Sequence, residues 1–97
     1  MMLVVVAYDV RTDSSAGRRR LRRVAKVCED TGQRVQNSVF ECLVDAAQWT
    51  KFRARLISEA ELNEDSLRFY FLGNKWQDRV EHVGTKEAYN PQGPLVI

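Results

Sequence analysis

The apolar and polar positions of the chain follow two different periods. Residues 3–7 are apolar without interruption and rich in β-branched side chains, which is typical of a central strand, and the run meets a carboxylate at Asp9. Further on, apolar side chains recur at i, i+3, i+4 and i+7, the spacing of one helix face, at Leu21, Val24, Ala25 and Cys28. The pattern therefore predicts a buried strand followed by an amphipathic helix.

Capping residues set the expected bounds of this helix. Ser14 or Ser15 is suited to the N-cap, and the helix runs to Thr31, where Gly32 is expected to form a C-cap in the left-handed conformation. The face opposite the apolar stripe is basic and consists of Arg19, Arg22, Arg23 and Lys26. We expect these bases to face solvent and to be free to bind.

The middle of the chain predicts strands and a second helix. Residues 33–44 are rich in strand formers and hold one turn-like dipeptide, Asn37-Ser38, so they form two short strands or one bent strand. Asp45 then caps a helix, with Gln48 as the partner in a capping box. The core face of that helix is formed by Trp49, Phe52, Leu56 and Ala60.

The last third of the chain has one clear element. Residues 66–72 alternate well enough to form a strand, which Gly73-Asn74 closes. Residues 74–90 show no clear period, and the lone His82 among them is expected to be structural or exposed rather than catalytic. The tail at residues 91–97 ends in three apolar side chains and is expected to add a strand to a sheet edge.

This order of elements predicts an α+β fold. Strand, helix, strand, strand, helix and strand match a ferredoxin-like βαββαβ sandwich with an antiparallel sheet, here with an extra C-terminal strand. The length of 97 residues indicates a single domain over residues 1–97. Because two helices cover only one face of the sheet, we expect a homodimer formed through the sheet faces, with residues 91–97 pairing with the partner subunit.

Composition narrows the class of protein. Hydrophobic residues at 44% and charged residues at 29% exclude a disordered chain. The apolar run near the N-terminus is too short to span a bilayer, so we expect a cytoplasmic protein without a membrane partner. Cys28 and Cys42 lack the spacing of a zinc or redox motif and are expected to be reduced core thiols.

Charge is distributed unevenly along the chain. The formal net charge is only +2, but residues 11–26 hold seven bases against the single acid Asp13. This concentration favours a polyanionic partner, although a solvated helix face remains an alternative. Arginine binds phosphate through planar bidentate contacts, and we expect such contacts from Arg20, Arg22 and Arg34.

The sequence leaves open the roles of three side chains, Asp9, Tyr8 and Phe40. A carboxylate is seldom buried unpaired, so Asp9 either caps the turn that follows it, faces a cation, or simply begins the polar loop. Tyr8 and Phe40 are suited to contact a base or sugar, and equally to fill the core or a dimer interface.

Four ordered stretches carry a resemblance that spans nearly the whole chain. They are Tyr-Asp-Val at residues 8–10, the basic helix segment 20–24, residues 34–41 and residues 65–70. Together they resemble the CRISPR-associated Cas-two family, the small universal subunit of spacer acquisition. The resemblance implies a ferredoxin-like homodimer in a bacterial or archaeal cytoplasm. It also implies two further partners, DNA or RNA and the larger CRISPR integrase subunit.

The same resemblance implies a site. Asp9 would be the catalytic residue and would meet its symmetry mate across the dimer to hold Mg²⁺ or another divalent cation, which activates water for phosphodiester cleavage. Nucleic acid would be bound by Arg19, Arg20, Arg22, Arg23 and Arg34. Supporting positions would be Tyr8, Ser38 and Phe40. An endonuclease needs Asp9 and the metal. A non-catalytic scaffold that bridges integrase subunits and spacer DNA needs the arginines and the dimer but not Asp9, and an interaction module needs only the dimer surface, so three functions stay open.

Overall fold

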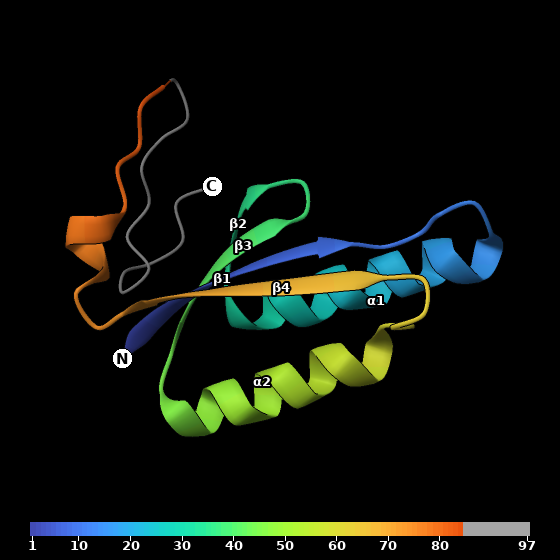
Figure 1. Ribbon diagram of the computed structural model, residues 1–97, viewed down its shortest axis with the longest axis horizontal. Helices are drawn as coiled ribbons and strands as arrows, with labels where there is room; N and C mark the ends of the chain where they lie inside the picture. Colours follow the sequence, from blue (N-terminus) through green and yellow to red (C-terminus); the bar gives the residue numbers. More distant parts are fainter. Residues whose placement is uncertain (85–97) are drawn as a thin grey trace.

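The computed structural model describes residues 1–84, and within them the chain forms four strands, two long helices and one 3₁₀ helix (Figure 1). In chain order these are β1 (Met2–Asp9), α1 (Ser15–Thr31), β2 (Gln33–Gln36), β3 (Val39–Val44), α2 (Ala46–Glu59), β4 (Ser66–Gly73) and η1 (Trp76–Arg79). The βαββαβ order confirms the predicted ferredoxin-like α+β fold. The predicted C-terminal strand at residues 91–97 lies outside the described residues.

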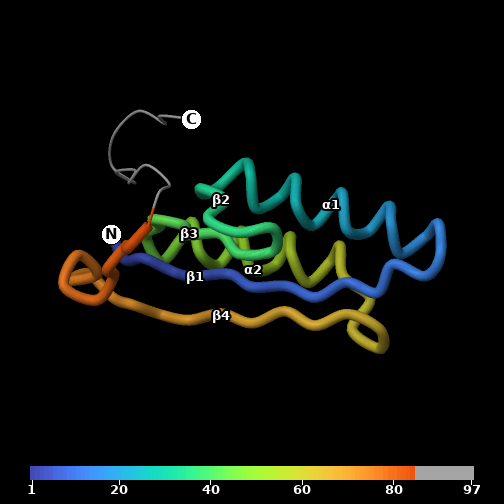
Figure 2. The backbone as a smooth tube through the Cα atoms, turned by 90° about the horizontal axis from the view of Figure 1, so that it is seen from above, coloured from blue at the N-terminus to red at the C-terminus, as the bar shows by residue number. Residues whose placement is uncertain are grey.

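The apolar strand β1 lies inside the sheet, as its uninterrupted run of apolar side chains predicts. The strand order is β2-β3-β1-β4, and β1 pairs antiparallel with both β3 and β4. Figure 2 shows the strands side by side in this order, running from β4 to β2 toward α1. Every neighbouring pair is antiparallel, because β2 also runs opposite to β3.

Both helices pack against the same face of the sheet. One core cluster joins side chains of β1 and β3 to the buried residues of the helices, which are Val24, Val27 and Cys28 of α1 and Phe52 and Leu56 of α2. The predicted stripe of α1 is confirmed at its centre, while Leu21 and Ala25 pack at the margin of the core and Val27 was missed. The two cysteines are free and fully buried, as predicted.

Alternation along β1 divides its side chains between two faces. Val4, Val6 and Tyr8 point into the core beneath the helices. The intervening positions lie on the other face, which the helices leave uncovered and which we call the open face. Pairing of β1 with β3 and β4 adds further residues to it, so that the open face includes Val5, Ala7, Asp9, Val39, Glu41, Leu43, Ser66, Arg68 and Tyr70.

The predicted helix caps are largely confirmed. Ser14 is the N-cap of α1, and its hydroxyl accepts a hydrogen bond from the amide of Gly17 at 3.0 Å. Asp45 and Gln48 form the capping box of α2, with side-chain to backbone distances of 2.7 and 2.9 Å. Such caps satisfy amides that have no partner within the helix.

The sequence correctly predicted that Gly32 ends α1, but the predicted left-handed backbone conformation was wrong. Gly32 does end α1, and its amide donates to the carbonyl of Cys28 at 2.8 Å. Its φ of −142° is extended, however, and any residue can adopt it. Glycine is needed because a Cβ here would lie 2.6 Å from the carbonyl oxygen of Glu41 and would overlap the Sγ of Cys42.

The segment after β4 was not predicted. Gly73 closes β4 with a φ of +76°, and η1 follows. The Arg79 guanidinium donates to the carbonyl of Leu72 at 2.8 Å, which ties η1 back to the end of β4. Among residues 1–84, no helix has the length and apolar character needed to cross a membrane.

Candidate functional site

Asp9 lies at the end of β1 on the open face. Alternation along the strand sends Tyr8 into the core and turns the next side chain outward, and Asp9 is exposed opposite Ser66 of β4. Its carboxylate makes no hydrogen bond or ion pair with any of residues 1–84. The carboxylate is therefore available to a ligand on the face that the helices do not cover.

The donor set around Asp9 is small. No group of three or more histidine, cysteine or acidic side chains that could hold a metal occurs among the described residues. Mg²⁺ prefers oxygen ligands in octahedral geometry and keeps several waters, so one carboxylate fits its chemistry but does not complete a site. Beyond residues 1–84, another copy of the chain could supply a second carboxylate, and water or a phosphate could supply the remaining oxygen ligands.

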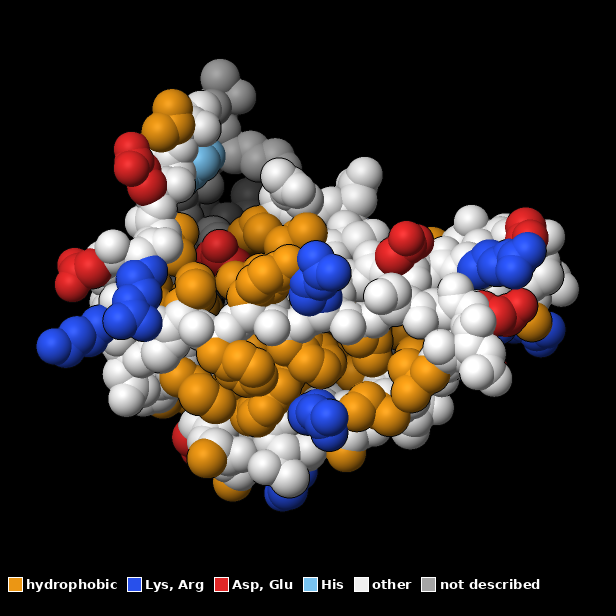
Figure 3. Space-filling view, viewed as in Figure 1, with side chains coloured by type: hydrophobic (Ala, Val, Ile, Leu, Met, Phe, Trp, Pro, Cys, Tyr) orange, Lys and Arg blue, Asp and Glu red, His pale blue; other side chains and the backbone are white. Residues whose placement is uncertain are grey.

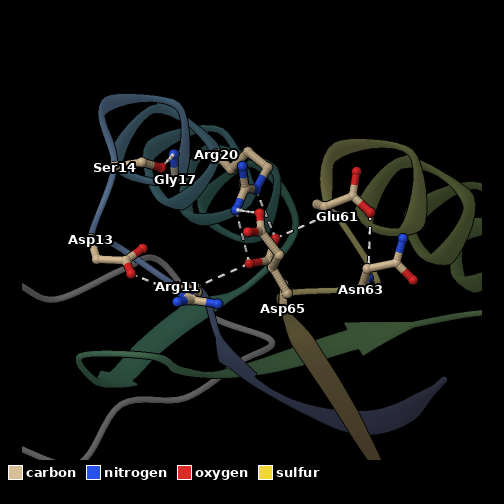
Figure 4. Close-up of polar contacts among 9 residues, drawn as sticks. Arg11, Asp13, Ser14, Gly17, Arg20, Glu61, Asn63 and Asp65 are labelled. Carbon is tan, nitrogen blue, oxygen red and sulfur yellow. Dashed lines mark hydrogen bonds and ion pairs between the residues drawn. The ribbon is translucent and has the colours of Figure 1, made fainter.

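Asp65 is a second carboxylate close to Asp9 in the sheet, and it differs from Asp9 because it is buried and hydrogen-bonded. Its side chain is fully buried and accepts four hydrogen bonds, from the Nε and Nη2 of Arg20 and from the amides of Arg11 and Glu61 (Figure 4). These donors, with the Arg20 guanidinium foremost, lower the pKa of Asp65 below its ordinary value. Because each of its two oxygens already accepts two hydrogen bonds, Asp65 is not free to bind a metal.

Arg20 is placed differently from the other bases of α1. Its side chain is only 12% exposed and forms ion pairs with Asp65 at 2.9 Å and with Glu64 at 3.1 Å. The predicted stretches at residues 20–24 and 65–70 thus meet in space through this pair. In this arrangement the guanidinium is bonded to carboxylates rather than presented to a phosphate.

The basic face of α1, formed by Arg19, Arg22, Arg23 and Lys26, is exposed as predicted. Two of the four are paired, because Arg23 contacts Glu59 at 2.9 Å and Lys26 contacts Asp30 at 3.0 Å. Arg19 and Arg22 have no ion pair with the described residues. The expectation that all four bases are free was therefore wrong for Arg23 and Lys26, although exposed pairs of this kind are weak and exchange readily for other anions.

Arg34 lies on the helix side of the sheet. Its Nη2 contacts Glu29 at 3.1 Å, and its guanidinium carbon lies 5.0 Å from the centre of the Phe40 ring. This stacking orients the guanidinium toward the C-terminal part of α1. Arg34 and Asp9 are consequently on opposite sides of the sheet.

The three supporting positions gather at the turn between β2 and β3. The rings of Tyr8 and Phe40 stack with centres 6.2 Å apart, and both are core residues, with exposures of 6% and 0%. Burial raises the pKa of Tyr8, and its hydroxyl donates to the carbonyl of Asn37 at 3.4 Å. The amide of Tyr8 donates to the carbonyl of Ser38 at 3.0 Å. In this arrangement neither ring is available to stack on a base.

Arg68 and Tyr70 are open-face residues that sequence reasoning did not single out. Arg68 pairs with Ala7 and therefore lies diagonally from Asp9 on the same face, within the reach of a long side chain. Its Nη1 contacts the Tyr70 hydroxyl at 3.2 Å. The alternation of residues 66–72 contained this information, because Ser66, Arg68 and Tyr70 occupy every second position.

The fold and these features define a small ferredoxin-like protein with an exposed carboxylate at a strand end and a basic helix. The model of the family described as "CRISPR associated protein Cas2" matches residues 2–80, and the chain belongs to this family. A relative from Chlorobaculum tepidum named CRISPR-associated endoribonuclease Cas2 is 60% identical over 96 residues, which are 99% of this chain and 100% of that protein.

Solved structures agree with this assignment. The crystal structure of Streptococcus pyogenes Cas2 at pH 6.5 is similar with a TM-score of 0.74 and 55% identity, covering 86% of this chain and 100% of that one. A chain of a partial Cas6-RT-Cas1–Cas2 complex is similar with a TM-score of 0.57 and 28% identity, covering 98% and 100% of the two chains.

Proposed function

We propose that this chain acts in CRISPR adaptation as a homodimer that binds nucleic acid and cleaves phosphodiester bonds with the help of Mg²⁺ or another divalent cation. Membership of the Cas2 family supports the proposal, as does the name endoribonuclease carried by its relatives. A similar chain in a structure named as a partial Cas6-RT-Cas1–Cas2 complex supports the larger integrase subunit as a partner. The single observation that carries the catalytic part is the exposed carboxylate of Asp9, which has no hydrogen-bond or ion-pair partner within residues 1–84.

The open face supports the proposed dimer. Apolar side chains reach it from three strands, and Tyr70 is 46% exposed there. Figure 3 shows hydrophobic side chains at the surface above the line of β4, on the side away from α2. We expect sedimentation to give a dimer, and Val5→Asp, which places a charge on the open face, to weaken it. Ala54→Asp on the exposed side of α2 is the matched control, and a wild-type monomer at micromolar concentration would contradict the proposal.

The proposed chemistry follows from what each group can do. A divalent cation bound there would polarise a phosphoryl oxygen and lower the pKa of a bound water. Asp9 and its symmetry mate would hold the cation on the open face, which neither α1 nor α2 covers. The exposed Arg19 and Arg22 would hold phosphates farther along the nucleic acid, through charge-assisted bidentate hydrogen bonds.

The first test separates cleavage from binding. Asp9→Asn removes a negative charge beside a polyanion, so metal-free binding of labelled RNA and DNA should be unchanged or slightly tighter. Magnesium-dependent cleavage should be abolished. Asp13→Asn, which changes an exposed loop carboxylate nearby, is the control and should cleave normally. Cleavage by Asp9→Asn at the wild-type rate, after removal of contaminating nuclease, would rule out the proposed metal site.

The second test addresses the basic face. Replacing Arg19, Arg22 and Arg23 with Ala should reduce the slope of log affinity against log salt by up to roughly one unit per lost phosphate contact. The loss should be nearly uniform across sequences, since phosphates carry no sequence information. The double variant Lys51→Ala and Arg53→Ala removes exposed charges from α2 and is the control. An unchanged slope in the triple variant would identify the basic face as a solvated surface.

A non-catalytic scaffold that bridges integrase subunits and spacer DNA is the second candidate. Two observations favour it: residues 1–84 of one chain hold no group of three or more potential metal ligands, and a similar chain occurs in a complex whose name includes Cas1. A scaffold needs the dimer and the arginines but not Asp9. Spacer integration assayed with the Cas1 partner should then survive Asp9→Asn, whereas a required nuclease predicts its loss.

A further inference from the structure

We propose that Asp65, held by Arg20, is a positioning residue for Asp9. It would fix the direction in which the chain leaves β1, at residues 9–11, which we call the β1 exit. The inference rests on the proposed function in one respect, because it takes Asp9 as the group whose position matters. The geometry behind it involves only described residues.

One buried carboxylate joins three separate segments of the chain (Figure 4). Its Oδ1 accepts from the amide of Arg11 at 3.1 Å, and its Oδ2 accepts from the amide of Glu61 at 2.9 Å. Arg20 of α1 donates to both oxygens, at 2.9 and 3.2 Å. Asp65 therefore fastens the β1 exit and the turn before β4 to the same guanidinium.

Asp9 lies between two of these attachments. Its strand partner is Ser66, the residue directly after Asp65, and the amide bonded to Asp65 belongs to Arg11, two residues after Asp9. Val10 between them is buried, which fixes it from a further side. The two carboxylates consequently occupy opposite faces of the sheet at one point, with Asp65 beneath the helices and Asp9 on the open face.

The start of α1 closes the β1 exit from the other side. Gly17 has no room for a side chain, because a Cβ there would collide with the carbonyl oxygen of Arg11. The Ser14 cap and the bond from Arg18 Nη1 to the carbonyl of Thr12 at 3.3 Å hold the rest of the loop. The hydrogen bond from the Arg11 amide to Asp65 connects this loop to the turn that precedes β4.

A nearby ion pair provides the control. Arg23 and Glu59 join α1 to α2, at 2.9 Å, and their side chains are 57% and 34% exposed. No hydrogen bond or ion pair links either of them to the β1 exit among the described residues. Loss of that pair changes the helix surface alone. Loss of the Asp65 charge instead leaves the largely buried Arg20 with Glu64 as its remaining ion-pair partner. It also replaces one of the two oxygens that accept from the Arg11 and Glu61 amides with an NH2 group, which weakens the attachment of the β1 exit.

The experiment compares Asp65→Asn with Glu59→Gln in the full chain. For Asp65→Asn we expect kcat for magnesium-dependent cleavage to fall tenfold or more, half-saturation by Mg²⁺ to rise severalfold, and metal-free nucleic-acid affinity to stay within about twofold. The Arg11 amide should exchange with solvent faster. Glu59→Gln should match the wild type. Phe52→Leu, a core change away from the β1 exit, shows what loss of stability alone does.

The outcomes separate the two proposals. Wild-type kcat and Mg²⁺ dependence in folded Asp65→Asn would overturn the positioning role, as would the same kinetic loss in Phe52→Leu. If Asp65→Asn does not fold, Arg20→Lys keeps the charge but loses the bidentate geometry, and it should show the same loss to a smaller degree. If the wild type itself does not cleave, the proposed nuclease fails, and exchange at the amides of residues 9–11 alone decides whether Asp65 holds the β1 exit.

Discussion

Gly32 offers a sharp test of the packing described above, because two explanations for a glycine at a helix end predict opposite results. If glycine were needed for a left-handed backbone, Asn would replace it better than Ala would. The structure instead gives an extended φ of −142° and backbone atoms of β3 against the glycine. We therefore expect Gly32→Ala to destabilise the protein and Gly32→Asn to destabilise it more.

The magnitude follows from the space available. A Cβ on Gly32 would lie 2.6 Å from the carbonyl oxygen of Glu41 and 3.1 Å from the Cα of Cys42, and both are backbone atoms that cannot turn aside. Overpacking of this kind costs about 1–3 kcal/mol. The lower entropy of the unfolded chain with Ala offsets about 0.4–1 kcal/mol. The free energy of unfolding should fall by roughly 1–2 kcal/mol, which lowers Tm by about 4–16 °C in a domain of this size.

The assay is urea unfolding at a fixed protein concentration, with Gly73 as the matched control. Gly73 has a φ of +76°, and the nearest atom to an added Cβ is the flexible end of Arg79 at 3.3 Å. Here the backbone decides, so Gly73→Asn should be more stable than Gly73→Ala. A Gly32→Ala protein as stable as the wild type, or a Gly32→Asn protein more stable than Gly32→Ala, would refute the packing explanation.

Three further predictions concern buried groups and one exposed ring. Burial raises the pKa of Cys28 and of Cys42 to about 12, so neither thiol should react with an alkylating reagent at pH 8 until the protein unfolds; labelling of the native protein would contradict this. The folded pKa of Asp65 is lowered, so its contribution is present above its unfolded pKa of about 3.9 and is lost as pH falls through the folded pKa. The stability difference between wild type and Asp65→Asn should accordingly be about 3–5 kcal/mol at neutral pH and shrink in urea titrations below pH 4, and a pH-independent difference would count against the ion pair. Phe71 is 58% exposed but lies edge-on to Trp49 at 5.4 Å, so Phe71→Ala should cost at least about 0.5–1.5 kcal/mol, and an unchanged urea midpoint would show that the ring contact adds nothing.

Local patterns predicted the elements of this fold well. The spacing of Val24 and Cys28 marked the buried side of α1, and Ser14 and the Asp45–Gln48 pair marked where the two helices begin. These signals work because caps and periodicity depend on residues within one or two turns of each other. The order of the elements along the chain is compatible with only a few sheet topologies, and the structure has one of these, the antiparallel sheet β2-β3-β1-β4.

The candidate site was predictable only in part. Strand alternation, a local property, placed Asp9 at the end of β1, and its catalytic role stays a prediction. The same alternation pointed to Arg68, which was overlooked. A count of charges along residues 11–26 could not show that Arg23 is paired with Glu59, because that acid comes from another helix.

The amino-acid sequence by itself determined the helices, the strands, their caps and the family, since each depends on short-range pattern or ordered motifs. Tertiary structure alone decided the partners of the charged and small residues. Arg20 and Asp65 are 45 residues apart in the chain, and the space beside Gly32 is limited by β3, whose position is set by its pairing with β1 and β2. Such contacts depend on how α1, α2 and β4 pack together, because a buried charge is stable only where the fold brings an opposite charge to it.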